Sequence, residues 1–124
     1  MKAYKLLRLL KSDNQLHPLF INKKVPTPIG EWLPAEAHRT PGYAFRPGWH
    51  CCFLPYAPHL KTELSNGEKR VWVECEVENV TIYDRPWNQG GQWLLAQRMR
   101  INRVLTKEEV NEILKENEKE KGVA

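Results

Sequence analysis

Alternation of hydrophobic and polar residues is the strongest pattern in the chain, and it is clearest over Lys69–Tyr83 (KRVWVECEVENVTIY). Odd positions from Val71 to Val77 are apolar, whereas the even positions 74, 76 and 78 are glutamates. This period of two predicts a strand with one buried face. After Glu78-Asn79 the apolar residues fall on even positions, which is typical of a β-bulge or a short break. We expect the three glutamates to form a solvated face rather than a metal or acid/base site, because like charges at alternate positions do not converge without a partner.

Four further segments have strand-like patterns: Ala3–Leu10, Leu16–Ile21, Trp49–Leu54 and Gln92–Leu105. Turn-forming residues 12–15 separate the first two and predict a hairpin. Pro18 predicts an edge position for the second strand, since proline cannot donate to the ladder. In the last strand, the apolar face is expected to consist of Trp93, Leu95, Met99 and Ile101.

The C-terminal segment predicts a helix from Lys107 to about Lys119. Thr106 is a favourable N-cap, and Glu109 three residues later completes a capping box. Val110, Ile113 and Leu114 form its only apolar stripe, so the helix should cover an edge or face of the sheet. The pattern therefore predicts a single α+β domain: a twisted, mostly antiparallel sheet in residues 1–105, and a capped helix with an acidic tail in residues 106–124.

The segment Asn22–Thr40 is predicted to be a long proline-rich loop. Pro26, Pro28 and Pro34 rule out a long helix in it. Such long connections are either functional covers or simple surface wraps, and both interpretations stay open.

Composition and charge narrow the classes of partner. The chain has 124 residues and a net charge of +4; residues 1–105 carry 15 Lys and Arg against 9 Asp and Glu. A basic body is compatible with binding nucleic acid, a nucleotide or an acidic protein, and equally with an ordinary protein of mildly basic pI. No apolar run is long enough for a bilayer, no secretory signal is recognisable, and three cysteines make no disulfide framework. We therefore expect a cytoplasmic protein with no membrane partner.

Histidine and cysteine gather near the middle of the chain, where His50, Cys51, Cys52 and His59 occur close together. Adjacent cysteines on a strand point to opposite faces, so both cannot easily bind one ion. We expect no metal site and treat the cysteines as buried, inert thiols. No Walker A loop, dinucleotide fingerprint or nucleophile elbow is present.

Aromatic and basic residues supply the candidate binding set: Trp32, Trp49, Tyr56, Trp87, Arg98 and Arg100. The aromatic residues could wall a pocket for a planar ligand or base, or could fill the core of a small sheet. The two arginines lie on the polar face of the last predicted strand.

Two polar residues interrupt apolar faces. Arg8 shares a strand face with Tyr4, Leu6 and Leu10, so it must pair, reach a polar cavity or extend to solvent. His50 follows a Pro47-Gly48 turn that sends Trp49 to one side of the sheet and His50 to the other. A pocket, if present, is expected on the His50 side near Arg8.

Several short motifs, in order along most of the chain, resemble a kind of small phage or prophage domain that carries a Gly-Trp-His or Gly-Phe-His element. They are YKLLR at 4–8, GEW at 30–32, RPGWH at 46–50 and RMRINRVLT at 98–106. The resemblance implies a fold type and a phage or mobile-element setting, without an activity.

A remoter resemblance is to the ADP-ribosyltransferase superfamily. Arg8 on the first strand, Gly48-Trp49-His50 and Gln92 before a late strand follow the order of that superfamily's elements. The resemblance implies that Arg8 and His50 hold NAD and that Gln92 orients the ribose. The superfamily more often has glutamate at the last position, which stabilises the positive charge that develops as nicotinamide leaves.

The leading prediction is a non-catalytic binding module for a macromolecule or nucleotide-like ligand, without a cofactor. The alternative is an NAD-dependent ADP-ribosyltransferase-like enzyme, or a degenerate one. A structural virion or assembly component is a third hypothesis, and the oligomeric state stays open.

Overall fold

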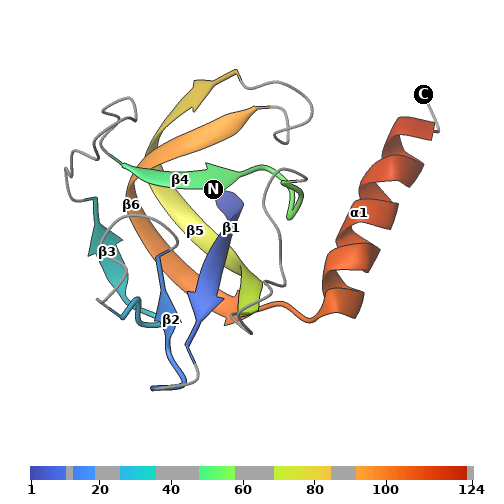
Figure 1. Cartoon of the computed structure of the whole chain (residues 1–124). Helices are drawn as coiled ribbons and strands as arrows, with labels where there is room; N and C mark the ends of the chain where they lie inside the picture. The colour runs from blue at the N-terminus through green and yellow to red at the C-terminus, as the bar shows by residue number, and fades with distance from the viewer. Residues whose placement is uncertain (11–12, 19–25, 36–47, 58–68, 85–91, 123–124) are drawn as a thin grey trace.

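A computed structural model describes residues 1–10, 13–18, 26–35, 48–57, 69–84 and 92–122. The elements occur in the order β1 (Lys2–Leu9), β2 (Leu16–His17), β3 (Trp32–Pro34), β4 (Trp49–Cys52), β5 (Lys69–Tyr83), β6 (Trp93–Val104) and α1 (Lys107–Gly122). Figure 1 shows the strands curving around into a closed arrangement with the helix beside them.

The sheet closes on itself. β1 pairs with β5 along its whole length, β5 pairs with β6, and β6 pairs with β4. β4 then returns to β1 through Tyr4 and Cys52, while β2 and β3 extend the free edges of β1 and β6. Every pairing between named strands is antiparallel, so the predicted antiparallel sheet with a C-terminal helix is confirmed. The closure itself was not predicted.

The long strands β5 and β6 change phase together. Val77 and Val80 both pack against the inner core, three positions apart, and Asn79 between them has φ 54°. Across from them Met99 and Ala96 are likewise three positions apart and both fully buried. At this level each strand has two residues, instead of one, between successive inward-facing positions. Because both strands do so opposite each other, their register does not change there. The phase change predicted at Glu78-Asn79 is real, but it is no register-shifting bulge.

The register shift between β5 and β6 lies instead between Glu74 and Cys75. The phase change in β6 also corrects one predicted face. Met99 and Ile101 do face the core, but Trp93 and Leu95 are only half-buried, and Leu94 and Ala96 take the inward positions.

Two apolar clusters lie on opposite faces of the closed sheet. β1 contributes to both, because Ala3 and Leu7 point inward while Tyr4 and Leu6 point outward. We call the first the inner core; its buried residues are Ala3, Leu7, Leu16, Cys51, Val73, Cys75, Val77, Leu94, Ala96, Met99 and Ile101. We call the second the outer cluster; its buried residues are Tyr4, Leu6, Cys52, Ala57, Trp72 and Leu105.

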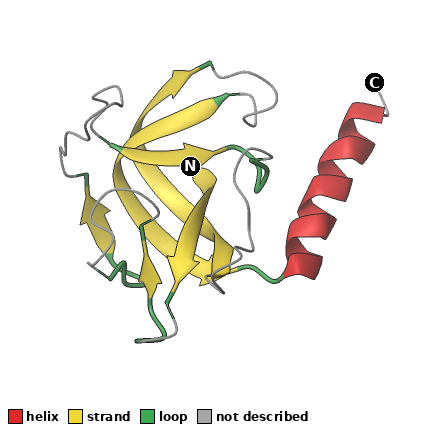
Figure 2. Cartoon of the chain, in the orientation of Figure 1, coloured by secondary structure: helices red, strands yellow, loops and turns green. Residues whose placement is uncertain are grey.

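Helix α1 stands beside the sheet at the end of β6 (Figure 2). Its capping box forms as predicted: the Glu109 amide donates to Thr106 Oγ1 at 3.1 Å, and the Thr106 amide donates to Glu109 Oε1 at 3.0 Å. Val110 and Ile113 of its apolar stripe pack against the outer cluster. No helix in the described part of the chain is long and apolar enough to span a membrane.

Strand β3 lies inside the segment that the sequence predicts to be a connection, so that prediction is wrong for Trp32–Pro34. Three residues, one of them proline, are too few to produce an alternation. The strand exists because β6 offers it a partner. Residues 22–25 and 36–40 of the predicted proline-rich loop lie outside the described residues.

Gly48 allows β4 to enter the sheet. Its φ of +138° is a conformation that residues with a side chain rarely adopt. A Cβ placed there would lie 2.8 Å from Leu95 Cγ and 3.1 Å from the carbonyl oxygen of Ala96. The glycine of the predicted Pro47-Gly48 turn therefore lets β4 approach β6 closely enough to close the sheet.

Candidate functional site

Trp32, Arg98 and Arg100 form a cationic-aromatic site on the outside of the sheet. The guanidinium carbon of Arg98 lies 4.8 Å from the centroid of the Trp32 ring, and that of Arg100 lies 5.1 Å from it. Both distances are within the range of a cation–π interaction. Three of the six predicted binding residues thus lie together.

Strand pairing builds this site. Trp32 lies directly opposite Arg100 and Pro34 opposite Arg98, so the ring and both guanidiniums share one face. That face is the outer one, because Met99 and Ile101 on the same strand are fully buried in the inner core. Trp32 is half-buried, Arg98 is exposed and Arg100 is half-buried.

The two arginines differ in their ionic partners. Arg98 donates from Nη1 to Glu78 Oε2 of β5 at 2.8 Å. Glu76 is the cross-strand neighbour of Arg100 but pairs instead with the amino group of Met1, at 3.3 Å. Within the described ranges no carboxylate pairs with Arg100, whose interaction there is with Trp32.

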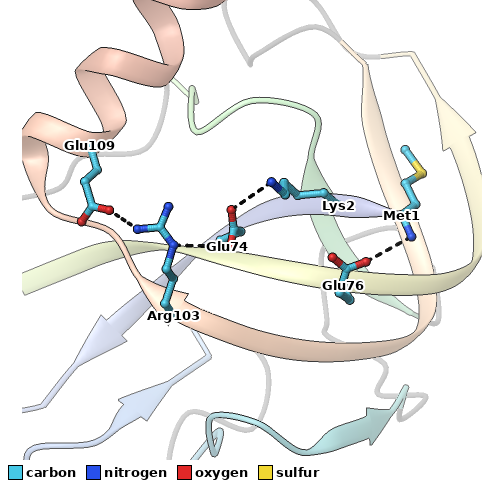
Figure 3. A network of polar contacts seen from close by, with 6 residues as sticks. All are labelled: Met1, Lys2, Glu74, Glu76, Arg103 and Glu109. Carbon is cyan, nitrogen blue, oxygen red and sulfur yellow. Dashed lines mark hydrogen bonds and ion pairs between the residues drawn. The ribbon is translucent and has the colours of Figure 1, made fainter.

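The remaining glutamate of β5 joins a charge network that reaches the helix (Figure 3). Glu74 pairs with Lys2 at 3.3 Å and with Arg103 at 3.4 Å, and Arg103 also pairs with Glu109. The hydrogen bond that Arg103 donates to the Glu109 carboxylate raises the pKa of Arg103. All three glutamates of β5 are therefore neutralised by basic groups, and no cluster that could hold a metal ion occurs in the described residues.

His50 sits in a second polar cluster, on the opposite side of β4 from Trp49. Its Nδ1 lies 2.8 Å from the Tyr83 hydroxyl oxygen, and its ring meets those of Tyr83 and Trp93 edge-on, at centroid distances of 6.1 and 6.2 Å. The alternation of Trp49 and His50 between the two faces agrees with the sequence-based prediction. Tyr83 and Trp93 were not predicted as its partners.

The described contacts of Arg8, His50 and Gln92 lead to different partners. Arg8 lies opposite His17 and Arg70 in the sheet, and its Nε donates to the carbonyl oxygen of Pro18 at 3.2 Å. Gln92 is exposed, and its amide donates to Asp84 Oδ1 at 3.2 Å.

The other predicted binding aromatics are dispersed. Trp49 packs against the inner core, and its indole nitrogen donates to the carbonyl oxygen of Leu33 at 3.1 Å. Tyr56 is half-buried in the segment after β4. Trp87 lies outside the described residues. The aromatic residues could either fill the core or wall a binding pocket. Trp49 packs against the core, whereas Trp32 lies at the surface.

Lys5 is a polar residue of the inner face that sequence reasoning missed. It alternates with Ala3 and Leu7 on β1, its ammonium donates to the carbonyl oxygen of His50 at 2.8 Å, and it lies 5.9 Å from the centroid of the Trp49 ring. The signal was a lysine in phase with two buried residues.

The three thiols are buried, as the sequence predicts. Burial raises the pKa of Cys51 to about 11 and of Cys52 to about 12, and it also raises the pKa of Cys75. The positive charge of Lys5 opposes each shift without overcoming it. At neutral pH these thiols are protonated and weakly nucleophilic.

No protein-family model, characterised protein or solved structure matches this chain.

Proposed function

We propose that this protein is a non-catalytic module that binds single-stranded nucleic acid through the cationic-aromatic site. The observation that carries the proposal is the placement of Trp32 against Arg98 and Arg100 on the outer face. Proteins that bind single strands combine positive charge along the backbone with an aromatic side chain against which a base can stack.

Charge supports the same ligand class. The chain carries a net charge of +4, and the glutamates of β5 are engaged with basic groups. Arg100 is held against an aromatic ring and has no carboxylate partner among the described residues. A guanidinium in this state is suited to a phosphate, which it binds through paired hydrogen bonds.

Fluorescence anisotropy with a labelled single-stranded oligonucleotide tests the proposal. We expect binding that weakens steeply with added salt, because each phosphate neutralised releases counterions. Trp32→Ala should weaken binding about tenfold, in line with the loss of about 1–3 kcal/mol per stacked base. Arg98→Ala/Arg100→Ala should weaken it further and flatten the dependence on salt.

Lys69→Ala/Lys115→Ala is the matched control, since it removes two positive charges at exposed positions away from the site. It should alter binding much less than the arginine pair does. Equal losses of affinity in the two double variants, or an affinity that does not depend on salt concentration, would contradict a defined site.

The ADP-ribosyltransferase-like interpretation and the phage setting stay predictions. A thermal shift measured with NAD examines the first, because a ligand that binds only the folded state raises the melting temperature in a saturable way. We expect no shift with NAD.

A further inference from the structure

The geometry points to Glu78 as an internal competitor for phosphate: Arg100 is ready to bind one phosphate, whereas Arg98 becomes available to a second only when the ligand displaces Glu78. This inference rests on the proposed function and concerns the same site. It assigns different roles to two arginines that the sequence pattern treats alike.

Arg100 is prepared for an anion. Its guanidinium is half-buried against Trp32, and the carboxylate directly across the strand, on Glu76, is turned to the amino group of Met1. The guanidinium therefore keeps its orientation without an ionic partner in the described part of the chain. A phosphate arriving there displaces no protein carboxylate.

Arg98 is occupied, but its partner is weakly held. The Arg98–Glu78 pair is 2.8 Å long, and its two side chains are 46% and 45% exposed. Exposed pairs of this kind are typically worth about 0–1 kcal/mol. A phosphate, which accepts two hydrogen bonds from one guanidinium, can replace the carboxylate at small cost.

The spacing of the arginines suits two successive phosphates rather than one. They are two residues apart on one strand and on one face, which places their Cα atoms about 7 Å apart. A ligand with one phosphate gains the Arg100 contact but meets the repulsion of Glu78. An oligonucleotide supplies a second phosphate that competes for Arg98, so Glu78 favours oligonucleotides over mononucleotides.

The experiment measures oligonucleotide affinity and its salt dependence for Glu78→Gln, Arg98→Ala and Arg100→Ala, and for the first combined with each of the others. Glu78→Gln should raise affinity about threefold and weaken the preference for oligonucleotides over a mononucleotide, assayed by competition. Arg100→Ala should lower affinity about tenfold in both backgrounds. Arg98→Ala should lower it about twofold in the wild-type background and about tenfold in the Glu78→Gln background, a coupling that a double-mutant cycle isolates.

Glu76→Gln is the matched control, because it removes the same charge from the same face of β5 without releasing either arginine. It should raise affinity less than Glu78→Gln does and should leave the effect of Arg98→Ala unchanged. Circular dichroism melting curves confirm that each variant folds.

The two proposals fail separately. Absence of oligonucleotide binding by the wild-type protein at low salt overturns the proposed function, and this inference with it. Binding in which Arg98→Ala has the same effect in both backgrounds, or in which Glu78→Gln and Glu76→Gln behave alike, overturns the role of Glu78 and leaves the proposed function standing.

Discussion

Two parts of the outer surface of the sheet differ in what packs against them. The part formed by β1 and the first half of β5 carries Leu6 and Trp72, and helix α1 covers it through Val110 and Ile113. The part formed by β3 and the middle of β6 carries Trp32, which packs against two arginines. Both surfaces present a tryptophan, but Trp72 is only 8% exposed and belongs to an apolar cluster.

The comparison shows that the neighbours decide what an aromatic side chain does. Beneath a packed helix, tryptophan contributes stability through the apolar area that it removes from water. Between charged side chains at the surface, it contributes a flat, polarisable face that a cation or a base can contact. Stability and binding are therefore expected to divide between the two tryptophans.

The largest expected effect sharpens this division. Trp72→Ala should lower the free energy of unfolding by about 3–5 kcal/mol, since it opens a cavity in the outer cluster. Trp32→Ala should lower it by no more than about 1 kcal/mol, as is usual for surface substitutions. Urea unfolding followed by circular dichroism measures both. Similar losses would show that the uncovered surface is as important for stability as the covered one.

The second prediction concerns the strand that closes the sheet and so holds the two surfaces in place. Gly48→Ala should cost about 2–3 kcal/mol, because it adds backbone strain to a close approach to Leu95 and Ala96. Gly30→Ala is the control, since Gly30 also has a positive φ, of 85°, but no atom lies within 4 Å of an added Cβ. It should cost only about 1 kcal/mol. Thermal unfolding of the two variants makes the comparison, and equal costs would remove the steric argument.

The third prediction concerns the attachment of the covering helix. Thr106→Ala should lower the free energy of unfolding by about 1 kcal/mol, because the Glu109 amide loses its capping oxygen. Thr81→Ala makes the same substitution at an exposed position of β5 and should have a smaller effect. Helix content by circular dichroism should fall only in the first variant. A loss shared by both would indicate that the cap does not anchor α1.

The smallest expected effect is a dependence on pH at the start of α1. Hydrogen bonds from the Thr106 amide and from Arg103 lower the pKa of Glu109 below its ordinary value. The charged form is thus favoured in the folded state, so its contribution is present above the unfolded pKa of about 4.3 and is lost as pH falls through the lower folded value. A carboxyl titration by nuclear magnetic resonance reads this pKa directly.

Arg103→Gln provides the control for this titration, because it removes one of the two hydrogen bonds. The pKa of Glu109 should then rise part of the way toward its ordinary value. An unchanged pKa would mean that Arg103 does not contribute to the charge network around the helix start.

Local patterns predicted most of the elements. The bounds of β5 agree with the alternation at both ends, and α1 begins where the capping box places it. These features depend on residues within a few positions of one another, so a single stretch of sequence contains their cause. Strand β3 has no such pattern, because its three residues are held by pairing with β6.

The sequence predicts the three residues of the candidate site as binding residues, but it does not predict that they lie together. In the sequence, Trp32 belongs to a predicted loop, and Arg98 and Arg100 belong to the polar face of the last predicted strand. Their meeting requires the register that places Trp32 opposite Arg100, and pairing between segments so far apart in the chain cannot be read from either segment alone. The alternate spacing of glutamates on β5 and of arginines on β6 is the sequence signal for the Glu78–Arg98 pair.

The sequence by itself determined the strands with strong alternation, the helix with its cap, and the basic and aromatic residues available for binding, because periodicity and capping are local. Only the tertiary structure decided that the sheet closes, that β5 and β6 change phase together, and that one tryptophan is covered while another meets two arginines. Closure depends on the long-range contacts of β4 with β1 and β6, and on Gly48 allowing β4 to lie against β6. Such contacts form only where the whole chain brings distant segments together.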